Sequence, residues 1–212
     1  MTLNTFKKAL SLLHKGEWRE LYIRALLSLG ILDFTNVDID ELRLSPEASN
    51  PYSDTGREYL QTVLSSFKIT KTDAIVDFGS GKGGALITLA DYPFAKITGV
   101  EISQEMIDIA QRNLARLRIK NVNMVCCDAK DFTHIDEYNY FYFFNPFPCT
   151  IMHDVVGNIK LSMKRNPRKI NIIYLNPVCH STVTEGGFFK KIAEYDHFVN
   201  KFYIYTGEEN TC

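Results

Sequence analysis

A run of apolar residues that ends in closely spaced glycines constrains the fold of this chain more than any other feature. Residues 75–84 read Ile-Val-Asp-Phe-Gly-Ser-Gly-Lys-Gly-Gly. The β-branched run is typical of a buried parallel strand, and the glycines allow a sharp turn into a helix. At such a turn the backbone can approach a ligand closely, and the N–H groups at the helix start face it. The sequence therefore predicts a strand, a turn and a helix with a ligand at the turn.

The glycine spacing fits two classes of ligand. Gly79, Gly81 and Gly84 match the dinucleotide pattern GxGxxG, and Gly83 in place of Gly84 gives GxGxG. Asp77, two residues before the first glycine, distinguishes the two classes. A carboxylate in the ligand crevice repels a pyrophosphate but attracts a ligand that carries an ammonium and a sulfonium group. Asp77 therefore favours S-adenosylmethionine.

Two further apolar runs also end in acids. Residues 96–101 end in Glu101, a little over twenty residues after Asp77, where nucleotide-binding folds place an acceptor for ribose hydroxyls. Residues 122–127 are followed by Asp128, whose carboxylate can accept a hydrogen bond from an adenine amino group. Three strands in succession that end in acids indicate a nucleoside site at one edge of a sheet.

These segments resemble the class I, seven-strand S-adenosylmethionine-dependent methyltransferases over about residues 50–205. The matching motifs are Val76-Asp77-Phe78-Gly79-Ser80-Gly81-Lys82-Gly83, Gly99-Val100-Glu101-Ile102-Ser103, Cys127-Asp128-Ala129 and Phe144-Asn145-Pro146-Phe147. The resemblance implies these cofactor contacts: Asp77, Gly79, Gly81 and Gly83 for the methionine end, Glu101 for the ribose, and Ile102, Asp128 and Ala129 for the adenine. It implies S-adenosylmethionine as the cofactor and leaves the methyl acceptor, a small molecule or a protein, open.

The chemistry is expected after the apolar run 140–144, at Asn145-Pro146-Phe147. Methyl transfer is an in-line displacement, so the enzyme supplies alignment and excludes water. The Asn145 carbonyl can orient an acceptor amine close to the cofactor, and Phe147 can attract the sulfonium by a cation–π contact. Asn145, Pro146 and Phe147 are thus the candidate catalytic residues, similar to the Asn-Pro-Pro-aromatic motif of amino-group methyltransferases, with the aromatic third instead of fourth. A turn that merely ends the strand is the competing interpretation.

Other sequence features leave alternatives open. Asn-x-Phe after the fourth strand, with Tyr52 and Thr55, is similar to the seven-strand protein-lysine methyltransferases of the nucleosomal histone type. That resemblance implies that Tyr52 and Thr55 close over the methionine moiety. His180 can serve instead as a general base for an oxygen acceptor such as a sugar. A nicotinamide-binding oxidoreductase or a silent nucleotide-binding module is a third interpretation.

The order of the predicted elements indicates an α/β fold. Alternating strands and helices predict a doubly wound, mostly parallel seven-strand sheet, closed by an antiparallel hairpin near Asn200. We expect an N-terminal helical extension and linker over 1–54 and the cofactor-binding domain over 55–212. The expected helices are 4–14, 17–30, 55–67, 84–90, 103–117 and 150–164, and the expected strands are 75–78, 96–101, 122–127, 139–145 and 170–175, followed by a β-rich tail over 195–206.

Composition narrows the function classes. The formal net charge of −1 provides no basic footprint for nucleic acid. The five cysteines are odd in number and contain no CxxC pair, which favours neither a zinc site nor a disulfide framework and indicates a reducing compartment. No signal peptide is visible and no apolar stretch reaches the roughly 18 residues of a membrane span. We expect a cytoplasmic enzyme without a metal ion.

Overall fold

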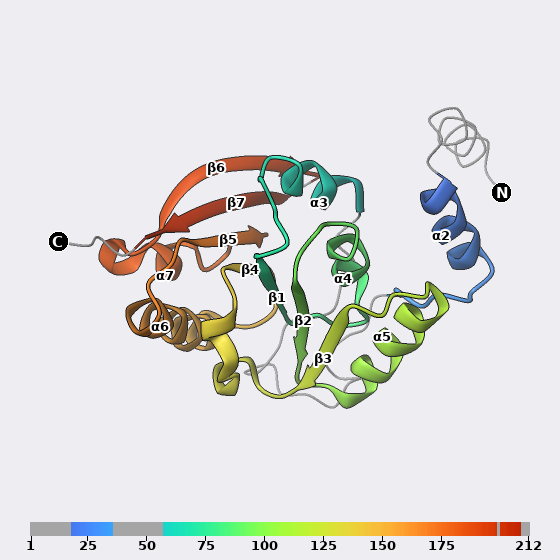
Figure 1. The fold of residues 1–212 in the computed structure, drawn as a ribbon, viewed down its shortest axis with the longest axis horizontal. Helices are drawn as coiled ribbons and strands as arrows, with labels where there is room; N and C mark the ends of the chain where they lie inside the picture. Colours follow the sequence, from blue (N-terminus) through green and yellow to red (C-terminus); the bar gives the residue numbers. More distant parts are fainter. Residues whose placement is uncertain (1–17, 36–56, 199, 209–212) are drawn as a thin grey trace.

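The computed structural model describes residues 18–35, 57–198 and 200–208. Seven strands form one mixed sheet (Figure 1): β1 Ala74–Phe78, β2 Lys96–Glu101, β3 Val122–Cys126, β4 Tyr140–Phe144, β5 Ile170–Leu175, β6 Lys190–His197 and β7 Asn200–Gly207. Their order across the sheet is β3-β2-β1-β4-β5-β7-β6. The first five strands in this order are parallel, and β7 pairs antiparallel with both β5 and β6. The predicted doubly wound sheet and its closing hairpin are confirmed.

Helices cover both faces of the sheet (Figure 1). Alternate residues of each strand point to opposite faces, so Phe141 and Phe143 of β4 join one buried cluster and Tyr140 and Tyr142 join the other. The first cluster lies under α6 and α7, and the second lies under α3, α4 and α5. The described helices are α2 Trp18–Ser28, α3 Arg57–Leu64, α4 Gly84–Leu89, α5 Gln104–Arg116, α6 Cys149–Arg165 and α7 His180–Thr184.

Helix α5 shows how local sequence fixes an element next to the predicted site. Ser103 is its N-cap, and the Ser103 side chain accepts a hydrogen bond from the Met106 amide. Met106, Ala110 and Leu114 recur at helical spacing and are buried. The predicted helix is confirmed within one residue at each end, and Ser103 ties its start to the strand end that carries Glu101.

The described part of the N-terminal extension packs on the domain core. Ile23 and Leu26 of α2, with Leu32 after it, belong to the same buried cluster as Leu60 of α3. The first predicted helix, the linker and the residues Tyr52 and Thr55 lie outside the described residues. The boundary between an extension at 1–54 and a domain at 55–212 stays a prediction.

A disulfide joins Cys149, the first residue of α6, to Cys179, which precedes α7. The expectation that the cysteines form no disulfide is therefore wrong for this pair. The two residues are 30 apart in the sequence, and the neighbouring strands β4 and β5 bring their Cα atoms to 5.4 Å. Sequence spacing alone cannot show that approach. The cytoplasmic location stays a prediction, now without the support of cysteine usage.

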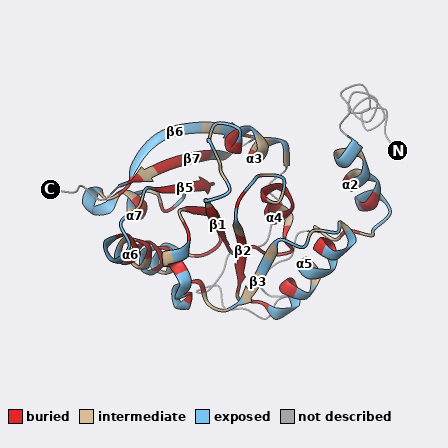
Figure 2. Cartoon of the chain, in the orientation of Figure 1, coloured by how far each residue is buried: buried red, intermediate tan, exposed pale blue. Residues whose placement is uncertain are grey.

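Figure 2 shows the strands largely buried and the outer faces of the helices exposed. In β4 and β5 nearly every residue is buried, as expected for parallel strands covered on both faces. Strand β6 at the sheet edge is mostly exposed or half-buried. Among the described helices, none combines the length and apolar character needed to cross a membrane.

Candidate functional site

Two buried carboxylates lie at the carboxyl edge of the sheet, on the adjacent strands β1 and β2. Asp77 is 2% exposed and Glu101, the last residue of β2, is 7% exposed. The Asp77 Oδ2 atom is buried and has no hydrogen-bond partner among the described residues. A buried carboxylate oxygen without a partner is costly, and at the end of a strand that turns through glycines it indicates a ligand.

Burial and charge repulsion both act on Asp77. Burial, with the Glu101 carboxylate as a smaller contribution, raises the pKa of Asp77 well above its ordinary value of 3.8. A ligand that brings a positive charge to Asp77 reverses that shift, because it stabilises the carboxylate form. A positively charged ligand would therefore bind more favourably at Asp77 than a neutral or negative one.

Glu101 is already held by three backbone N–H groups. Its Oε2 accepts from the Gly81 amide at 2.9 Å, and its Oε1 accepts from Ile102 at 2.9 Å and Ser103 at 3.0 Å. Burial raises the pKa of Glu101, and these three hydrogen bonds act in the opposite direction. A carboxylate offers about four acceptor positions, so about one is left for a ribose hydroxyl. The expectation that Glu101 contacts the ribose stays a prediction. The remaining acceptor position has room for one of the two ribose hydroxyls.

The glycine turn adopts backbone conformations that only glycine accepts without strain. The φ angles are +74° at Gly79, +50° at Gly81 and +83° at Gly83. The amides of Gly79 and Ser80 donate to the Val100 carbonyl, as Gly81 does to Glu101. The Gly83 amide donates to the Ser80 carbonyl. These four amides thus bond within the protein, and the expectation that N–H groups at the start of α4 face a ligand stays a prediction.

The Asn145-Pro146 segment lies directly against this turn. A Cβ atom built on Gly79 would lie 2.2 Å from the Pro146 Cβ, so only glycine fits there. Asn145 has a φ of +37°, in the left-handed region that asparagine tolerates better than most residues. Asn176, at the end of β5, has a φ of +52° and is also followed by a proline. The structure thus brings the candidate catalytic segment and the candidate cofactor turn into contact.

A narrow pocket opens between the ends of β1, β2, β3 and β4. Its cavity volume of about 20 Å³ means that a nucleoside fits only after lining side chains shift. Val100 and Cys127 line it without having been predicted as site residues, although each directly precedes a predicted acid. Burial raises the pKa of the Cys127 thiol, which keeps it protonated. The lining residues are Gly79, Val100, Glu101, Ile102, Cys127, Asp128, Ala129, Pro146 and Phe147.

Asp128 caps the short helical turn Ala129–Asp131. Its Oδ1 accepts from the Lys130 amide at 3.2 Å, and its Oδ2 lies 3.1 Å from the Lys130 Nζ atom. Each oxygen retains a second acceptor position, so an adenine amino group can still bind. The adenine contact assigned to Asp128 stays a prediction.

Phe147 is 4% exposed and packs edge-on against Phe143 of β4, with ring centroids 6.2 Å apart. It lines the pocket as predicted, but most of its ring lies in the core. Its contact with a sulfonium stays a prediction.

His180, the alternative base, is held by a tyrosine. Its Nδ1 lies 2.8 Å from the Tyr205 hydroxyl, and burial raises the pKa of that phenol. The phenol stays protonated, so it either donates to Nδ1 or accepts a hydrogen bond from an Nδ1–H. Only when Nδ1 carries the proton does Nε2 keep a lone pair for a substrate hydroxyl. Within the described residues no cluster of three or more histidine, cysteine or acidic side chains is arranged to hold a metal ion.

A family model described as a methyltransferase domain matches residues 69–204, more than half of the chain. The chain belongs to this methyltransferase family. Similar solved structures include an RNA methyltransferase from Salinibacter ruber in complex with S-adenosyl-L-homocysteine, which is 15% identical with a TM-score of 0.57 over 74% of this chain and 95% of that one. The putative methyltransferase YhhF from Escherichia coli is 18% identical with a TM-score of 0.59 over 73% and 86%. The prediction of a class I S-adenosylmethionine-dependent methyltransferase is confirmed at the level of family and fold.

Two curated proteins of Rickettsia prowazekii are similar to this methyltransferase chain. The uncharacterized protein RP789 is 33% identical over 117 residues, which cover 53% of this chain and 20% of that protein. The uncharacterized protein RP028 is 26% identical over 131 residues, which cover 59% of this chain and 49% of that protein. The matched regions thus span half or less of these relatives.

Proposed function

We propose that this chain binds S-adenosylmethionine at the ends of β1, β2 and β3 and transfers its methyl group to a nitrogen acceptor. The observation that carries the first half is the Oδ2 of buried Asp77, which has no hydrogen-bond partner among the residues that the structure describes. The turn after it has already used the amides of Gly79, Ser80, Gly81 and Gly83. A pyrophosphate needs free N–H donors and no nearby anion, whereas a methionine ammonium needs an acceptor. The buried Asp77 carboxylate therefore favours the amino acid end of S-adenosylmethionine over a nicotinamide dinucleotide.

The residues present fit this cofactor. Asp77 would hold the ammonium group, the remaining acceptor position of Glu101 would hold the ribose, and Ile102, Asp128 and Ala129 would contact the adenine. When bound, the cofactor supplies a methyl group on a sulfonium, which is open to attack by a nucleophile on the side opposite the sulfur. Buried residues around the pocket, above all Phe147 and Val100, exclude water from that attack.

Asn145 supports a nitrogen acceptor. The contact of Pro146 with Gly79 fixes the segment against the cofactor turn, and the left-handed backbone of Asn145 re-aims the chain as β4 ends. An Asn145 carbonyl can accept one N–H of an amine and orient the nitrogen lone pair toward the methyl group. The acceptor nitrogen must arrive unprotonated, because an ammonium group has no lone pair to attack with.

The alternative is an oxygen acceptor with His180, which contacts Tyr205, as its base. Two variants separate the two mechanisms. With methyl-labelled S-adenosylmethionine and a fractionated cell extract as the acceptor source, we expect label on nitrogen. Asn145→Ala should lower turnover by about 10²–10³ and leave S-adenosylhomocysteine affinity within a few-fold.

The matched control is His180→Ala, which should keep most of the activity. A melting temperature measured for each variant distinguishes a lost contact from a lost fold. Label recovered on oxygen, with His180→Ala as the more damaging change, would contradict the proposal of a nitrogen acceptor. Near-normal turnover of Asn145→Ala would remove Asn145 from the mechanism.

A further inference from the structure

Lys82, in the middle of the glycine turn, directs its charge toward a segment of the N-terminal extension. The Lys82 side chain is only 3% exposed. Its Nζ atom donates to Asp33 Oδ1 and to Thr35 Oγ1, both at 2.8 Å. Lysine is rarely this buried unless its charge is paired. None of the contacts proposed for the cofactor uses Lys82, so its burial calls for a separate explanation.

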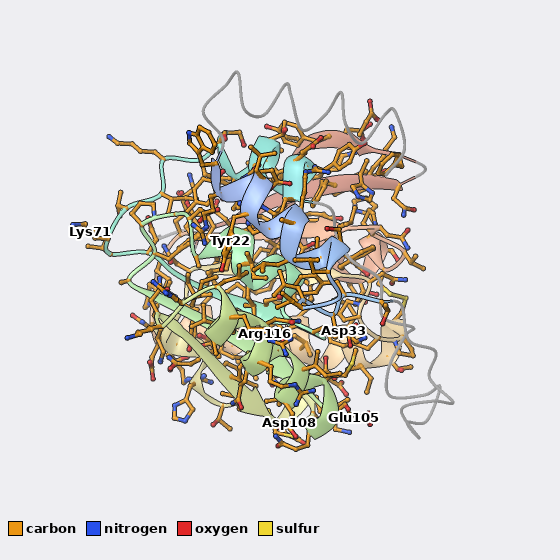
Figure 3. The ribbon with its side chains drawn as sticks, turned by 90° about the vertical axis from the view of Figure 1, so that its right-hand side faces the viewer. Tyr22, Asp33, Lys71, Glu105, Asp108 and Arg116 are labelled. Carbon is orange, nitrogen blue, oxygen red and sulfur yellow. A yellow bond between two sulfur atoms is a disulfide. The ribbon has the colours of Figure 1, made fainter. Side chains whose placement is uncertain are left out.

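Asn113 of α5 ties the same two segments together. It is 1% exposed, and its Nδ2 donates to the Lys82 carbonyl at 3.1 Å and to the Asp33 carbonyl at 2.9 Å. The Asp33 amide donates back to Asn113 Oδ1 at 3.1 Å. Arg116 of α5 donates to the Ile31 carbonyl, and Figure 3 labels Asp33 and Arg116 where the stretch after α2 meets α5. We call the following residues the connector clasp: Asp33, Thr35, Lys82 and Asn113.

The connector clasp and Glu101 hold neighbouring residues of one turn. Glu101 accepts from the Gly81 amide, and the clasp fixes the carbonyl and the side chain of Lys82. Gly81 and Gly83, on either side of Lys82, have left-handed backbones and little intrinsic rigidity. A turn made of such residues keeps one shape only when its surroundings fix it. Without the clasp, the turn would have to be ordered when the cofactor binds, and that ordering weakens binding.

We propose that Lys82 is a positioning residue, which holds the glycine turn in its cofactor-binding shape by pairing with Asp33 and Thr35. This inference rests on the proposed cofactor site. Lys82 thereby couples residues 31–35 of the N-terminal extension to cofactor affinity. Because such coupling is reciprocal, bound cofactor should stabilise residues 31–35 by the same free energy by which these residues stabilise bound cofactor.

The test compares two charged contacts that both join the N-terminal segment to the domain. Lys82→Met keeps most of the apolar side chain and removes the positive charge that pairs with Asp33 in the connector clasp. Arg57→Met is the matched control, because Arg57 binds Glu20 of α2 at 2.8 Å and Asp91 at 2.6 Å, and none of these residues belongs to the glycine turn. S-adenosylhomocysteine affinity is measured by calorimetry well below both melting temperatures. We expect about tenfold weaker binding for Lys82→Met and less than about twofold for Arg57→Met.

Two further measurements test whether Lys82 couples residues 31–35 to cofactor binding. Thr35→Val removes one partner of Lys82 from an exposed position, so it should fold and bind about two- to threefold more weakly. Hydrogen exchange should show that S-adenosylhomocysteine slows the amides of residues 31–35 in the wild-type protein and has no such effect in Lys82→Met.

Unchanged affinity in Lys82→Met, or in Thr35→Val if Lys82→Met does not fold, would overturn the inference. An equal loss in Arg57→Met would overturn it as well, because general destabilisation would then explain the effect. Absence of binding to the wild-type protein would refute the cofactor site itself, and the inference with it.

Discussion

Replacing Asp77 with asparagine should stabilise the unliganded protein and weaken its binding of S-adenosylhomocysteine, which remains after methyl transfer. In the unliganded protein Asp77 Oδ2 is buried with no partner in the described part of the chain, and Glu101 repels its charge. An unsatisfied buried polar group costs about 1–3 kcal/mol, and the asparagine amide recovers only part of that. We expect Asp77→Asn to gain about 1–2 kcal/mol, which raises the melting temperature of a chain of this size by about 2–8 °C.

The ligand should narrow or reverse this difference in stability. S-adenosylhomocysteine at 100-fold excess over its dissociation constant stabilises the wild-type protein by about 2.7 kcal/mol. In the proposed site its ammonium group pairs with Asp77, and loss of a hydrogen bond to a charged group costs about 1.5–3 kcal/mol. At the same ligand concentration Asp77→Asn should therefore be stabilised by only about 0.3–1.3 kcal/mol, half of the wild-type value or less. The assay is differential scanning calorimetry of both proteins, with and without ligand, at constant buffer and salt.

The pH dependence has a definite sign. The pKa of Asp77 is raised above 3.8 in the folded protein, so between 3.8 and that raised value the folded state binds more protons than the unfolded state. Through that window the Asp77 contribution to stability falls as pH rises. The advantage of Asp77→Asn should therefore appear at neutral pH and vanish below about pH 3.8. Ligand affinity of the wild-type protein should rise with pH through the same window, because Asp77 must lose its proton to pair with the ammonium group.

Asp73, which directly precedes β1, provides the control. Its Oδ1 accepts from Asn139 at 2.7 Å, and its Oδ2 accepts from the amide and hydroxyl of Thr70 at 2.7 and 2.9 Å. Asp73→Asn should lose stability and keep its ligand shift. A less stable Asp77→Asn protein with a normal ligand shift would refute the reasoning.

Three other changes test two residues of the site and the disulfide. Glu101→Ala should weaken S-adenosylhomocysteine binding by about 1.5–3 kcal/mol in a calorimetric titration, and unchanged affinity in the folded variant would place the ribose elsewhere. Gly79→Ala combines a positive φ with a collision at Pro146, so urea unfolding should show a loss of at least about 1–3 kcal/mol, and wild-type stability would contradict that packing. Reduction of the Cys149–Cys179 disulfide, which closes a loop of about 30 residues, should lower unfolding free energy by about 3 kcal/mol, and a Cys149→Ser protein should no longer respond to the reductant.

The sequence predicted the elements whose signals are local. Apolar β-branched runs located β1, β2 and β5 to within about a residue, and the spacing of Met106, Ala110 and Leu114 located α5. Helix α7 was missed, because its five residues His-Ser-Thr-Val-Thr have no apolar periodicity. The positions of Asp77 and Glu101 at one sheet edge followed from parallel strands ending in acids.

Features that depend on distant parts of the chain were not predictable in this way. The disulfide needs β4 and β5 side by side. The connector clasp requires Asp33 and Lys82, which are about 50 residues apart in the sequence, to come together beside Asn113 of α5. Asn113 lies between the buried Ala110 and Leu114 on the apolar side of α5. A polar residue at such a position indicates a buried hydrogen-bonded contact, and this signal was missed. The use of the turn amides by Val100 and Glu101 also appears only once the strand ends are placed together.

The central claim is that the glycine turn and the acids after β1 and β2 bind S-adenosylmethionine and not a dinucleotide. Calorimetric titration of one preparation of the full chain with S-adenosylhomocysteine and, in parallel, with NAD tests this most directly. We predict saturable binding of S-adenosylhomocysteine, lost or strongly weakened in Asp77→Asn, and no heat of binding for NAD. Binding of NAD, or no binding of S-adenosylhomocysteine by well-folded protein, would contradict the claim.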